Sequence, residues 1–353
     1  MASIAKVVVE ISLDREFDYR IPAHLRASIR VGSQVTVPFQ TRELRGFVVG
    51  LSNYSAFADK LKEIAGVVGD KPLIPDPIMK LAYWIADYYR APIEHAVRTV
   101  LPSAVRKRGA KHKKQLFVAL TGEVPESITA KQDEVFQTLH THGAMTVSEL
   151  KERTGCSDSP IKTLEKRGLV SISEETIQRD PHAGLELLRT KPFDLMVEQR
   201  TALEMINAAM DQEKPGAVLL HGVTGSGKTE VYLQAIQHAM DQGKGAIVLV
   251  PEIALTPQTV DRFRSRFGEC VAVLHSNLSD GERHDEWHRI RNGEASIAIG
   301  ARSALFAPIE NPGLIVVDEE HEATYKQDES PRYNARDVAV MRGHLENCCV
   351  VLG

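Results

Sequence analysis

Cysteines, aromatic residues and long apolar runs are all scarce in this chain of 353 residues. The four cysteines form no CxxC pair and two are adjacent, so they suggest neither a zinc site nor a disulfide framework and fit a reducing compartment. No run of about 18 apolar residues could span a membrane. Lys6 and Glu10 interrupt the apolar N-terminus, which excludes a signal peptide. The sequence therefore predicts a cytoplasmic protein with no membrane partner.

A surplus of either charge is also missing. Lys and Arg number 43 and Asp and Glu number 47, which gives a net charge of −4. This balance argues against a uniformly basic coat protein for nucleic acid, although a locally basic face remains compatible with it. Hydrophobic residues at 43% and charged residues at 25% are ordinary for a globular protein and exclude a disordered or collagen-like chain. The length suggests two or three domains.

The first part of the chain, residues 1–105, is predicted to form a small β-rich domain. Residues 6–12 and 34–50 are rich in Val and Phe and are punctuated by Gly and Pro, a pattern typical of short strands in a small sheet or barrel. Residues 76–90 carry apolar side chains at helical spacing. Residues 106–127 begin with clustered lysines and arginines and are predicted to be a basic linker. It would be either a solvated connection or an arm that contacts phosphates.

Residues 128–176 are predicted to form a winged helix-turn-helix. A helix at about 130–140 is followed by a capped helix start at Thr146, and Gly155 ends that second helix. A third helix and a strand at Leu169–Ile172 complete the order of this motif. Such modules bind duplex DNA or other protein surfaces, and the sequence leaves both possibilities open.

The last part of the chain, residues 177–353, alternates helical stretches with short Val- and Ile-rich runs. This alternation predicts βαβ units around a parallel sheet. The predicted buried strands are residues 217–220, 246–250, 271–274, 296–300, 314–317 and 349–352.

A phosphate-binding loop follows the first of these strands. The segment Gly222–Thr229 reads GVTGSGKT and matches the pattern GxxxxGK[ST], with a strand before it and a helix predicted at Glu230–Met240 after it. Its backbone N–H groups and the helix N-terminus would cradle phosphate oxygens. Lys228 would reach the β- and γ-phosphates of ATP and the Thr229 hydroxyl would hold Mg²⁺. The predicted nucleotide-binding residues are Gly222, Thr224, Gly225, Ser226, Gly227, Lys228 and Thr229.

A second group of candidate residues ends the strand at 314–317. Asp318 would bind Mg²⁺, mostly through water, and Glu319 would orient or deprotonate the attacking water. Glu320 and His321 complete this acidic segment, with His321 in the predicted catalytic set. Taken alone, the segment could also be a solvated acidic turn. Upstream, Gln199 is predicted to precede a helix and to read the adenine edge through its amide.

Together these motifs resemble those of superfamily 2 helicases of the DExH type. Two further segments agree: residues 251–258 read PEIALTPQ and residues 300–306 read GARSALF, each after a predicted strand. The residues of these motifs, together with Leu274–Ser276 (LHS), resemble those of the primosomal protein N′ (PriA) family of replication-restart helicases. The resemblance implies a RecA-like P-loop lobe within an α/β multidomain protein. It also implies that Thr256, Arg302 and Ser303 contact DNA.

The N-terminal region resembles the same family. The family's N-terminal domain binds the 3′ end of a nascent strand, and the matching residues here are Phe17, Asp18, Tyr19 and Lys62. An aromatic ring can stack on a terminal base, and a short acid can accept a hydrogen bond from a 3′-hydroxyl. Without the family, Phe17 and Tyr19 read as ordinary strand core. Gln40 stands where the family often has glycine, and its side chain could crowd the pocket.

The segment 325–337 resembles the family's aromatic-rich loop. Tyr325 would stack on bases, and Lys326 and Arg332 would contact phosphates. Placed directly after the acidic segment, the loop could report DNA occupancy to the ATP site. The alternative is a plain polar surface loop.

The resemblance implies an ATP- and Mg²⁺-dependent, 3′-to-5′ DNA helicase that recognises stalled forks and starts replication by primosome assembly. Its expected partners are DNA forks, nascent 3′ ends, primosome proteins and single-strand-binding protein. The family continues beyond this sequence with a second motor lobe and a cysteine cluster, so zinc is expected only there and the chain alone should hydrolyse ATP poorly. A branch-migration or restriction translocase is a second reading, and a non-catalytic module that binds DNA and recruits partners is a third.

Overall fold

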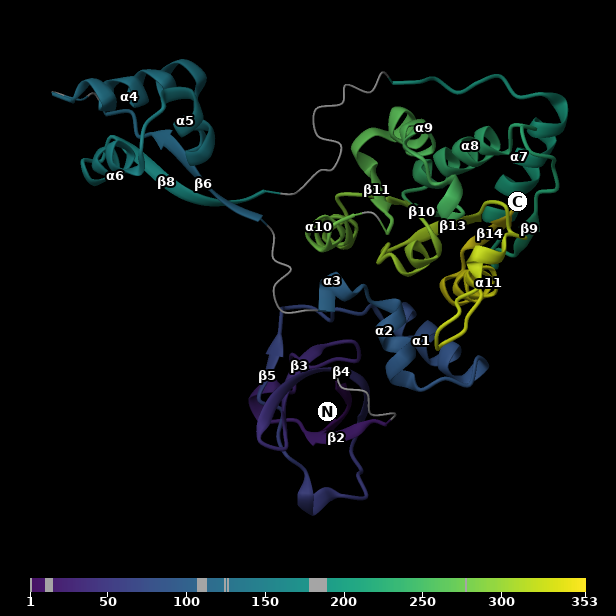
Figure 1. Cartoon of the computed structure of the whole chain (residues 1–353). Coiled ribbons are helices and arrows are strands. Elements are labelled where there is room, and N and C mark those ends of the chain that lie inside the picture. Colours follow the sequence, from purple (N-terminus) through teal and green to yellow (C-terminus); the bar gives the residue numbers. More distant parts are fainter. Residues whose placement is uncertain are drawn as a thin grey trace. The chain divides into compact units, whose positions relative to one another are not determined.

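The computed structural model describes residues 2–9, 15–106, 113–123, 125, 127–177, 189–276 and 278–353 (Figure 1). The chain forms two compact units. One combines Met1–Arg108 with His182–Gly353, and the other is Gly109–Pro181. None of the helices within these described ranges is both long enough and apolar enough to cross a bilayer.

The N-terminal strands form a closed five-stranded sheet. The strand order is β2-β1-β4-β3-β5, and neighbouring strands in this order pair antiparallel. Closure comes from Arg20 at the end of β2, whose N–H donates to the carbonyl of Lys62 at 2.9 Å and whose carbonyl accepts from Ile64 N at 3.0 Å. The expected small sheet or barrel is therefore confirmed. The strands are β1 (Ile4–Val9), β2 (Phe17–Arg20), β3 (Gln34–Phe39), β4 (Arg42–Ser52) and β5 (Gly66–Val68).

The C-terminal part of the same unit is built on a parallel sheet of six strands in the order β11-β12-β10-β13-β14-β9. The predicted α/β class is confirmed. The prediction that residues 217–220 form a buried strand is wrong, because β9 lies at the sheet edge beside β14 and Leu219 is 67% exposed. The strands are β9 (Ala217–Leu219), β10 (Gly245–Leu249), β11 (Val271–Leu274), β12 (Ile297–Gly300), β13 (Pro312–Val317) and β14 (Cys349–Leu352).

The two faces of this sheet belong to different hydrophobic clusters. Along β10, Ala246 and Val248 face one cluster while Ile247 and Leu249 face the other, as the alternation of side chains along a strand requires. The first face is covered by α7 (Val197–Met210), α8 (Lys228–Asp241) and α9 (Pro257–Phe267). The second face is covered by α10 (Asp280–Arg291), α11 (Ala335–Glu346) and helices from the N-terminal region.

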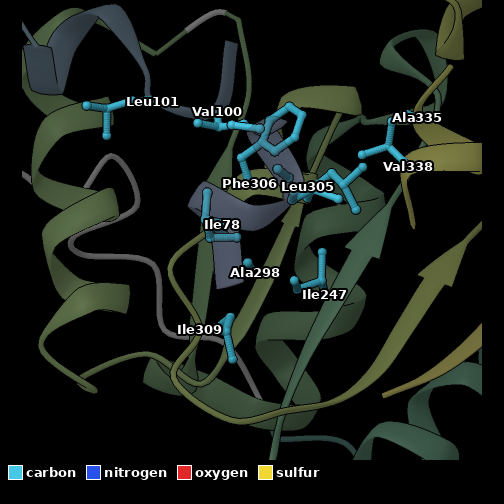
Figure 2. Packing of buried hydrophobic residues seen from close by; sticks show 14 of the residues in the cluster. Ile78, Val100, Leu101, Ile247, Ala298, Leu305, Phe306, Ile309, Ala335 and Val338 are labelled. Atoms are coloured by element: carbon cyan, nitrogen blue, oxygen red, sulfur yellow. The ribbon is translucent and has the colours of Figure 1, made fainter. Parts of the chain in front are cut away.

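Those N-terminal helices pack on the parallel sheet and are part of its core. They are α1 (Asp76–Tyr88), α2 (Ile93–Val100) and the short α3 (Ser103–Arg106). Figure 2 shows Ile78, Val100 and Leu101 in one cluster with Ile247 and Leu305. The predicted boundary between residues 1–105 and the motor lobe is therefore not a packing boundary. Burying an aliphatic side chain of this size contributes about 1.5–3 kcal/mol, so several of them hold the two segments firmly together.

The second unit has the element order of a winged helix. It contains β6 (Lys113–Leu120), α4 (Ala130–His142), β7 (Met145–Thr146), α5 (Val147–Thr154), α6 (Asp158–Lys166) and β8 (Val170–Ile177). Thr146 caps α5, because its hydroxyl accepts from Glu149 N at 3.1 Å, and Gly155 ends the helix with φ = 60°. These two local signals act as the sequence predicts.

One expectation for this unit needs correction. The predicted basic linker at 106–127 contains a strand, since β6 pairs antiparallel with β8 along its whole length and with β7 at Phe117 and Val118. The buried Val118 anchors it in the core of the unit. Lys113 and Lys114 begin this eight-residue strand and belong to the basic run that suggested a linker. Six basic residues motivated the idea of a phosphate-contacting arm, and three of them, Lys107, Arg108 and Lys111, lie outside the described residues.

Candidate functional site

The loop at Gly222–Gly227 joins β9 to α8, as the motif predicts. Gly225 and Gly227 have φ values of 80° and 84°, a left-handed conformation that favours glycine. At Gly227 a Cβ would also lie 2.3 Å from the Gln199 amide nitrogen. The backbone from Val223 to Ser226 is exposed at the N-terminus of the 14-residue helix α8. This cradle fits a polyphosphate, because backbone N–H groups at a helix N-terminus and the helix dipole both favour an anion there.

Lys228 and Thr229 occupy the first turn of α8. The Lys228 ammonium donates to the carbonyl of Gly222 at 2.7 Å and lies 3.7 Å from a carboxylate oxygen of Glu319. The lysine therefore spans from the loop to the acidic segment after β13. A cation in this position can bind phosphate oxygens and can offset the charge of the two adjacent acids.

Asp318 stands at the carboxyl end of β13, where its N–H donates to Leu249 O at 2.9 Å. Its carboxylate accepts from the hydroxyl of Tyr232 at 3.1 Å, and its carbonyl accepts from the hydroxyl of Tyr325 at 2.7 Å. Burial raises the pKa of Asp318, while the hydrogen bond from Tyr232 opposes that rise. A desolvated carboxylate of this kind is a suitable ligand for a hard cation such as Mg²⁺.

The other two acidic-segment candidates flank this carboxylate. Glu319 has φ = 47°, and its two carboxylate oxygens lie 3.7 Å from Lys228 Nζ and 3.7 Å from His321 Nε2. His321 is exposed. The structure thus brings Lys228, Asp318, Glu319 and His321 into one neighbourhood, with Lys228 on one side of Glu319 and His321 on the other.

Gln199 does not precede its helix, as the sequence suggested, but lies in the first turn of α7. Its side-chain oxygen accepts from Met196 N at 2.9 Å, and its amide nitrogen donates to the carbonyl of Ser226 at 2.8 Å. The helix begins earlier than expected because the Gln199 side chain caps it by accepting from the backbone N–H of the N-cap residue Met196. Its amide therefore contacts the phosphate loop directly.

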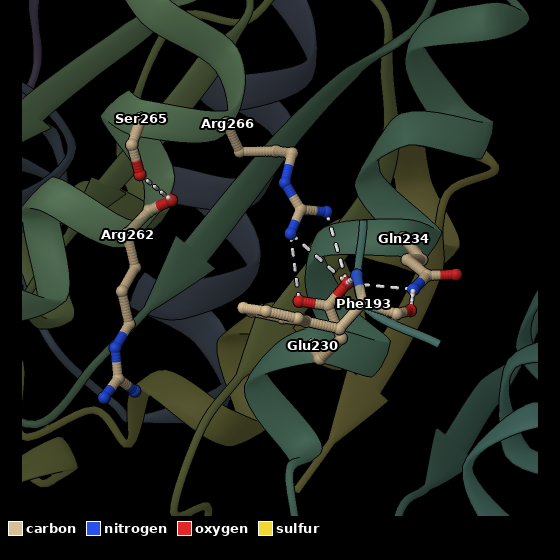
Figure 3. A network of polar contacts seen from close by, with 6 residues as sticks. All are labelled: Phe193, Glu230, Gln234, Arg262, Ser265 and Arg266. Carbon is tan, nitrogen blue, oxygen red and sulfur yellow. Dashed lines mark hydrogen bonds and ion pairs between the residues drawn. The ribbon is translucent and has the colours of Figure 1, made fainter. Parts of the chain in front are cut away.

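A buried ion pair helps to hold the segment before Gln199 against α8, the helix that begins with Lys228 (Figure 3). Glu230 accepts from Arg266 at 3.0 Å and from the N–H of Phe193 at 3.1 Å. Gln234 donates to the carbonyl of Phe193 at 2.9 Å. The backbone at Phe193 is thus held on both sides while its ring stays 69% exposed. The sequence offered no signal for this network, because its members come from three separate segments.

A cavity of about 710 Å³ opens at the carboxyl ends of the strands. The segments that follow β10, β11, β12 and β13 line it together with the end of α2 and the start of α3. Among the expected DNA contacts, Arg302, Ser303, Tyr325 and Lys326 line this cavity, whereas Thr256 and Arg332 do not. Thr256 instead caps α9 by accepting from Thr259 N at 3.3 Å. Ser276 and Arg283 also line the cavity, and the sequence assigned them no role.

The aromatic-rich loop is placed differently from the expected exposed stacking surface. Tyr325 and Tyr333 are each only 1% exposed. Arg302 donates to the carbonyls of Thr324 at 3.4 Å and Lys326 at 2.8 Å. The loop is therefore fixed from within by its tyrosines and held from the cavity side by an arginine.

The expected 3′-end residues lie on β2 and the neighbouring loops. Asp18 accepts from the Ser55 hydroxyl at 2.5 Å, and the rings of Phe17 and Phe39 meet edge to face with centroids 5.3 Å apart. Tyr19 is 4% exposed and belongs to the barrel core, as the alternative reading held. Lys62 is joined to β2 through the Arg20 pairing described above.

The turn between β3 and β4 contributes to the same region. Gln40 has φ = 50°, the left-handed conformation in which glycine is least strained, and its carbonyl accepts from Lys62 Nζ at 3.2 Å. Its side chain is exposed. The structure therefore gives a backbone reason for glycine at this position, apart from any effect on a pocket.

The fold and these sites define a class: a P-loop ATPase lobe of the helicase type joined to an N-terminal β-rich module. Two family models match accordingly. Residues 6–102 match the "3'DNA-binding domain (3'BD)" and residues 199–346 match the "DEAD/DEAH box helicase".

Over its whole length the chain resembles replication restart proteins PriA, which confirms the resemblance predicted from the motifs. It is 36% identical over 428 residues to that protein of Bacillus subtilis (strain 168), covering 99% of this chain and 53% of the relative. It is 38% identical to that of Chlamydia trachomatis, covering 99% and 48%. The chain thus spans about half the length of the curated relatives it matches.

A solved helicase structure also matches part of the chain. The structure of RecG bound to a three-way DNA junction shares 27% identity with a TM-score of 0.36, covering 46% of this chain and 21% of that one.

Proposed function

We propose that this chain is the fork-recognising and ATP-binding portion of a 3′-to-5′ DNA helicase that restarts replication and assembles a primosome. The observation that carries the proposal is the juxtaposition of Lys228 and Thr229 at the start of α8 with Asp318 at the end of β13. The cavity with Arg302 and Lys326 opens beside them. The resemblance to replication restart proteins, which extends over 99% of this chain, supports a role in replication restart.

In this proposal the P-loop holds ATP and Mg²⁺. The loop N–H groups and Lys228 bind the phosphates, while Thr229 and Asp318 hold the cation, which neutralises charge on the phosphates. Glu319 orients water at the end of the nucleotide. Phosphoryl transfer also needs an additional cation, which in analogous NTPases an arginine supplies at a gain of about 10³–10⁵ in rate. We therefore expect fast ATP hydrolysis to depend on an arginine in that role in addition to Lys228.

The N-terminal barrel supplies fork recognition. Asp18 accepts a hydrogen bond from a terminal 3′-hydroxyl and repels a phosphate at that place, while Phe17 offers its ring to the last base for stacking. The winged helix adds contact with duplex DNA. Primosome proteins and single-strand-binding protein are the proposed partners of the complete protein.

The test compares fork DNA ending in a 3′-hydroxyl with the same fork ending in a 3′-phosphate, measured by fluorescence anisotropy with this chain. Preference for the hydroxyl, lost in Asp18→Asn, supports fork-end recognition. Equal affinity for both ends contradicts the assignment of Asp18. Preference for junctions or intact duplex would instead favour a branch-migration or restriction motor. Rapid DNA-stimulated ATP turnover by the chain alone would overturn the expected dependence on a further arginine.

A further inference from the structure

Two tyrosine hydroxyls converge on Asp318. Tyr232 donates to the carboxylate oxygen Oδ1 at 3.1 Å, and Tyr325 donates to the backbone carbonyl at 2.7 Å. Each tyrosine is 1% exposed. A single residue is therefore fixed both at its side chain and at its backbone, by donors from two different segments.

Tyr232 comes from the helix that carries the P-loop lysine. It lies four residues after Lys228 on α8, and its hydroxyl also packs against Gly353, where a Cβ would come within 1.9 Å of the oxygen. Gly353 is itself held by its N–H to Val317 O at 2.9 Å. The hydroxyl is thus confined where α8 meets the ends of β13 and β14, so Asp318 cannot rotate without losing this bond.

Tyr325 comes from the wall of the cavity. Arg302 donates to the carbonyls of the residues on either side of it, Thr324 and Lys326. A phenol hydroxyl is protonated at neutral pH and can donate a hydrogen bond. Each therefore remains a hydrogen-bond donor.

We propose that Tyr232 and Tyr325 are positioning residues that hold Asp318 in the orientation needed to bind Mg²⁺ with ATP. The inference rests on the proposed ATP-binding function and adds two residues to which no role in the ATP site has been assigned. Groups that hydrogen-bond a metal-binding carboxylate commonly change metal affinity about 10–100-fold when removed. Tyr232 couples the cation site to the helix of the P-loop, and Tyr325 couples it to the cavity.

The experiment uses Tyr232→Phe and Tyr325→Phe in this chain, because phenylalanine keeps the ring and removes only the hydroxyl. ATP affinity is measured by the ligand-induced shift in melting temperature, once with Mg²⁺ and once with EDTA. Each variant should bind ATP about tenfold more weakly in Mg²⁺ and as well as the unsubstituted chain in EDTA. The matched control is Tyr83→Phe, which removes a hydroxyl bonded to the Val49 carbonyl at 2.9 Å between α1 and β4. It should change neither value.

The outcomes separate the proposals. Unchanged affinity in Mg²⁺ for both variants overturns the positioning role, and so does an equal loss in Mg²⁺ and EDTA, which indicates a general disturbance of the loop. If the unsubstituted chain binds ATP no better with Mg²⁺ than with EDTA, the proposed Mg²⁺–ATP site itself fails, and the positioning role fails with it.

Discussion

The side-chain amide of Gln199 bonds to the carbonyl of Ser226 at 2.8 Å while its oxygen accepts from Met196 N at 2.9 Å. One side chain therefore fixes both the start of α7 and the shape of the phosphate loop. The close approach also explains Gly227, where a Cβ would collide with the Gln199 amide. The interaction joins two segments that are 27 residues apart in sequence and that both belong to the proposed nucleotide site.

The first prediction concerns Gln199→Glu. Glutamate keeps the oxygen that caps α7 but cannot donate to Ser226, and its charge faces a carbonyl oxygen. The lost bond is exposed and contributes about 0.5–1.5 kcal/mol, so the melting temperature should change little, whereas the negative charge added beside the phosphate loop should lower ATP affinity about tenfold. Titration calorimetry measures the affinity. Gln199→Ala is the comparison, because it also loses the cap and should lower the melting temperature. Equal ATP affinity in Gln199→Glu and the parent would rule out the role of this bond.

The second prediction concerns Lys228→Ala. Removing the ammonium takes away the contact with the phosphates, so ATP-induced stabilisation should disappear. Binding to a fork with a 3′-hydroxyl should remain, because the barrel does not contain this lysine. Lys214→Ala, at an exposed position before β9, is the control and should change neither property. Loss of fork binding in Lys228→Ala would indicate that the two functions cannot be separated in this chain.

Local signals in the sequence predicted much of this architecture. The capped start at Thr146, the end of α5 at Gly155 and the glycines of the P-loop act through neighbouring residues, so a linear pattern contains them. The exposed edge position of β9 was missed because the order of strands in a sheet depends on distant segments. The packing of α1 and α2 on the parallel sheet was missed for the same reason, since an apolar helix face does not reveal its partner.

In the candidate site, too, local features were predicted from the sequence and contacts between distant segments were missed. The types of residue at Lys228, Thr229 and Asp318 and their order were sufficient to predict a nucleotide site. The hydroxyl of Tyr232 at Asp318 could not be predicted, because a tyrosine one turn into a helix is usually core. The ring of Tyr325 was expected at the surface, where it would stack on bases. In the structure the ring is buried, and the hydroxyl donates to the carbonyl of Asp318. Three-dimensional proximity decided its position.

The third prediction concerns Asp318→Asn and pH. Burial raises the pKa of Asp318 in the folded state, so the folded chain holds this proton more tightly than the unfolded chain. The contribution of Asp318 to stability therefore falls as pH rises from the unfolded pKa to the raised folded pKa. Asparagine carries no such charge and can still accept from Tyr232. Asp318→Asn should be the more stable protein without nucleotide, by a margin that grows from pH 4 to pH 8 in urea titrations.

The same variant should lose Mg²⁺-dependent stabilisation by ATP, because its amide is a weaker ligand for the cation. Glu320→Gln is the control, since Glu320 is paired with Arg336 at 3.0 Å and lies outside the proposed cation site. A margin for Asp318→Asn that shrinks with rising pH would contradict the raised pKa.

The last prediction concerns the turn between β3 and β4. Gln40 has φ = 50°, a conformation that costs an L-residue about 1–2 kcal/mol, whereas glycine adopts it without steric strain. Glycine also loses more entropy on folding, so the net gain in stability for Gln40→Gly should be about 0.5–1 kcal/mol. The bond from Lys62 to the carbonyl of residue 40 uses the backbone and should persist. Urea denaturation measures the change, and Thr41→Gly is the matched control. Thr41 has no positive φ, so glycine there should destabilise the turn. Destabilisation by Gln40→Gly would mean that the side chain of Gln40 contributes more to the barrel than its backbone strain costs.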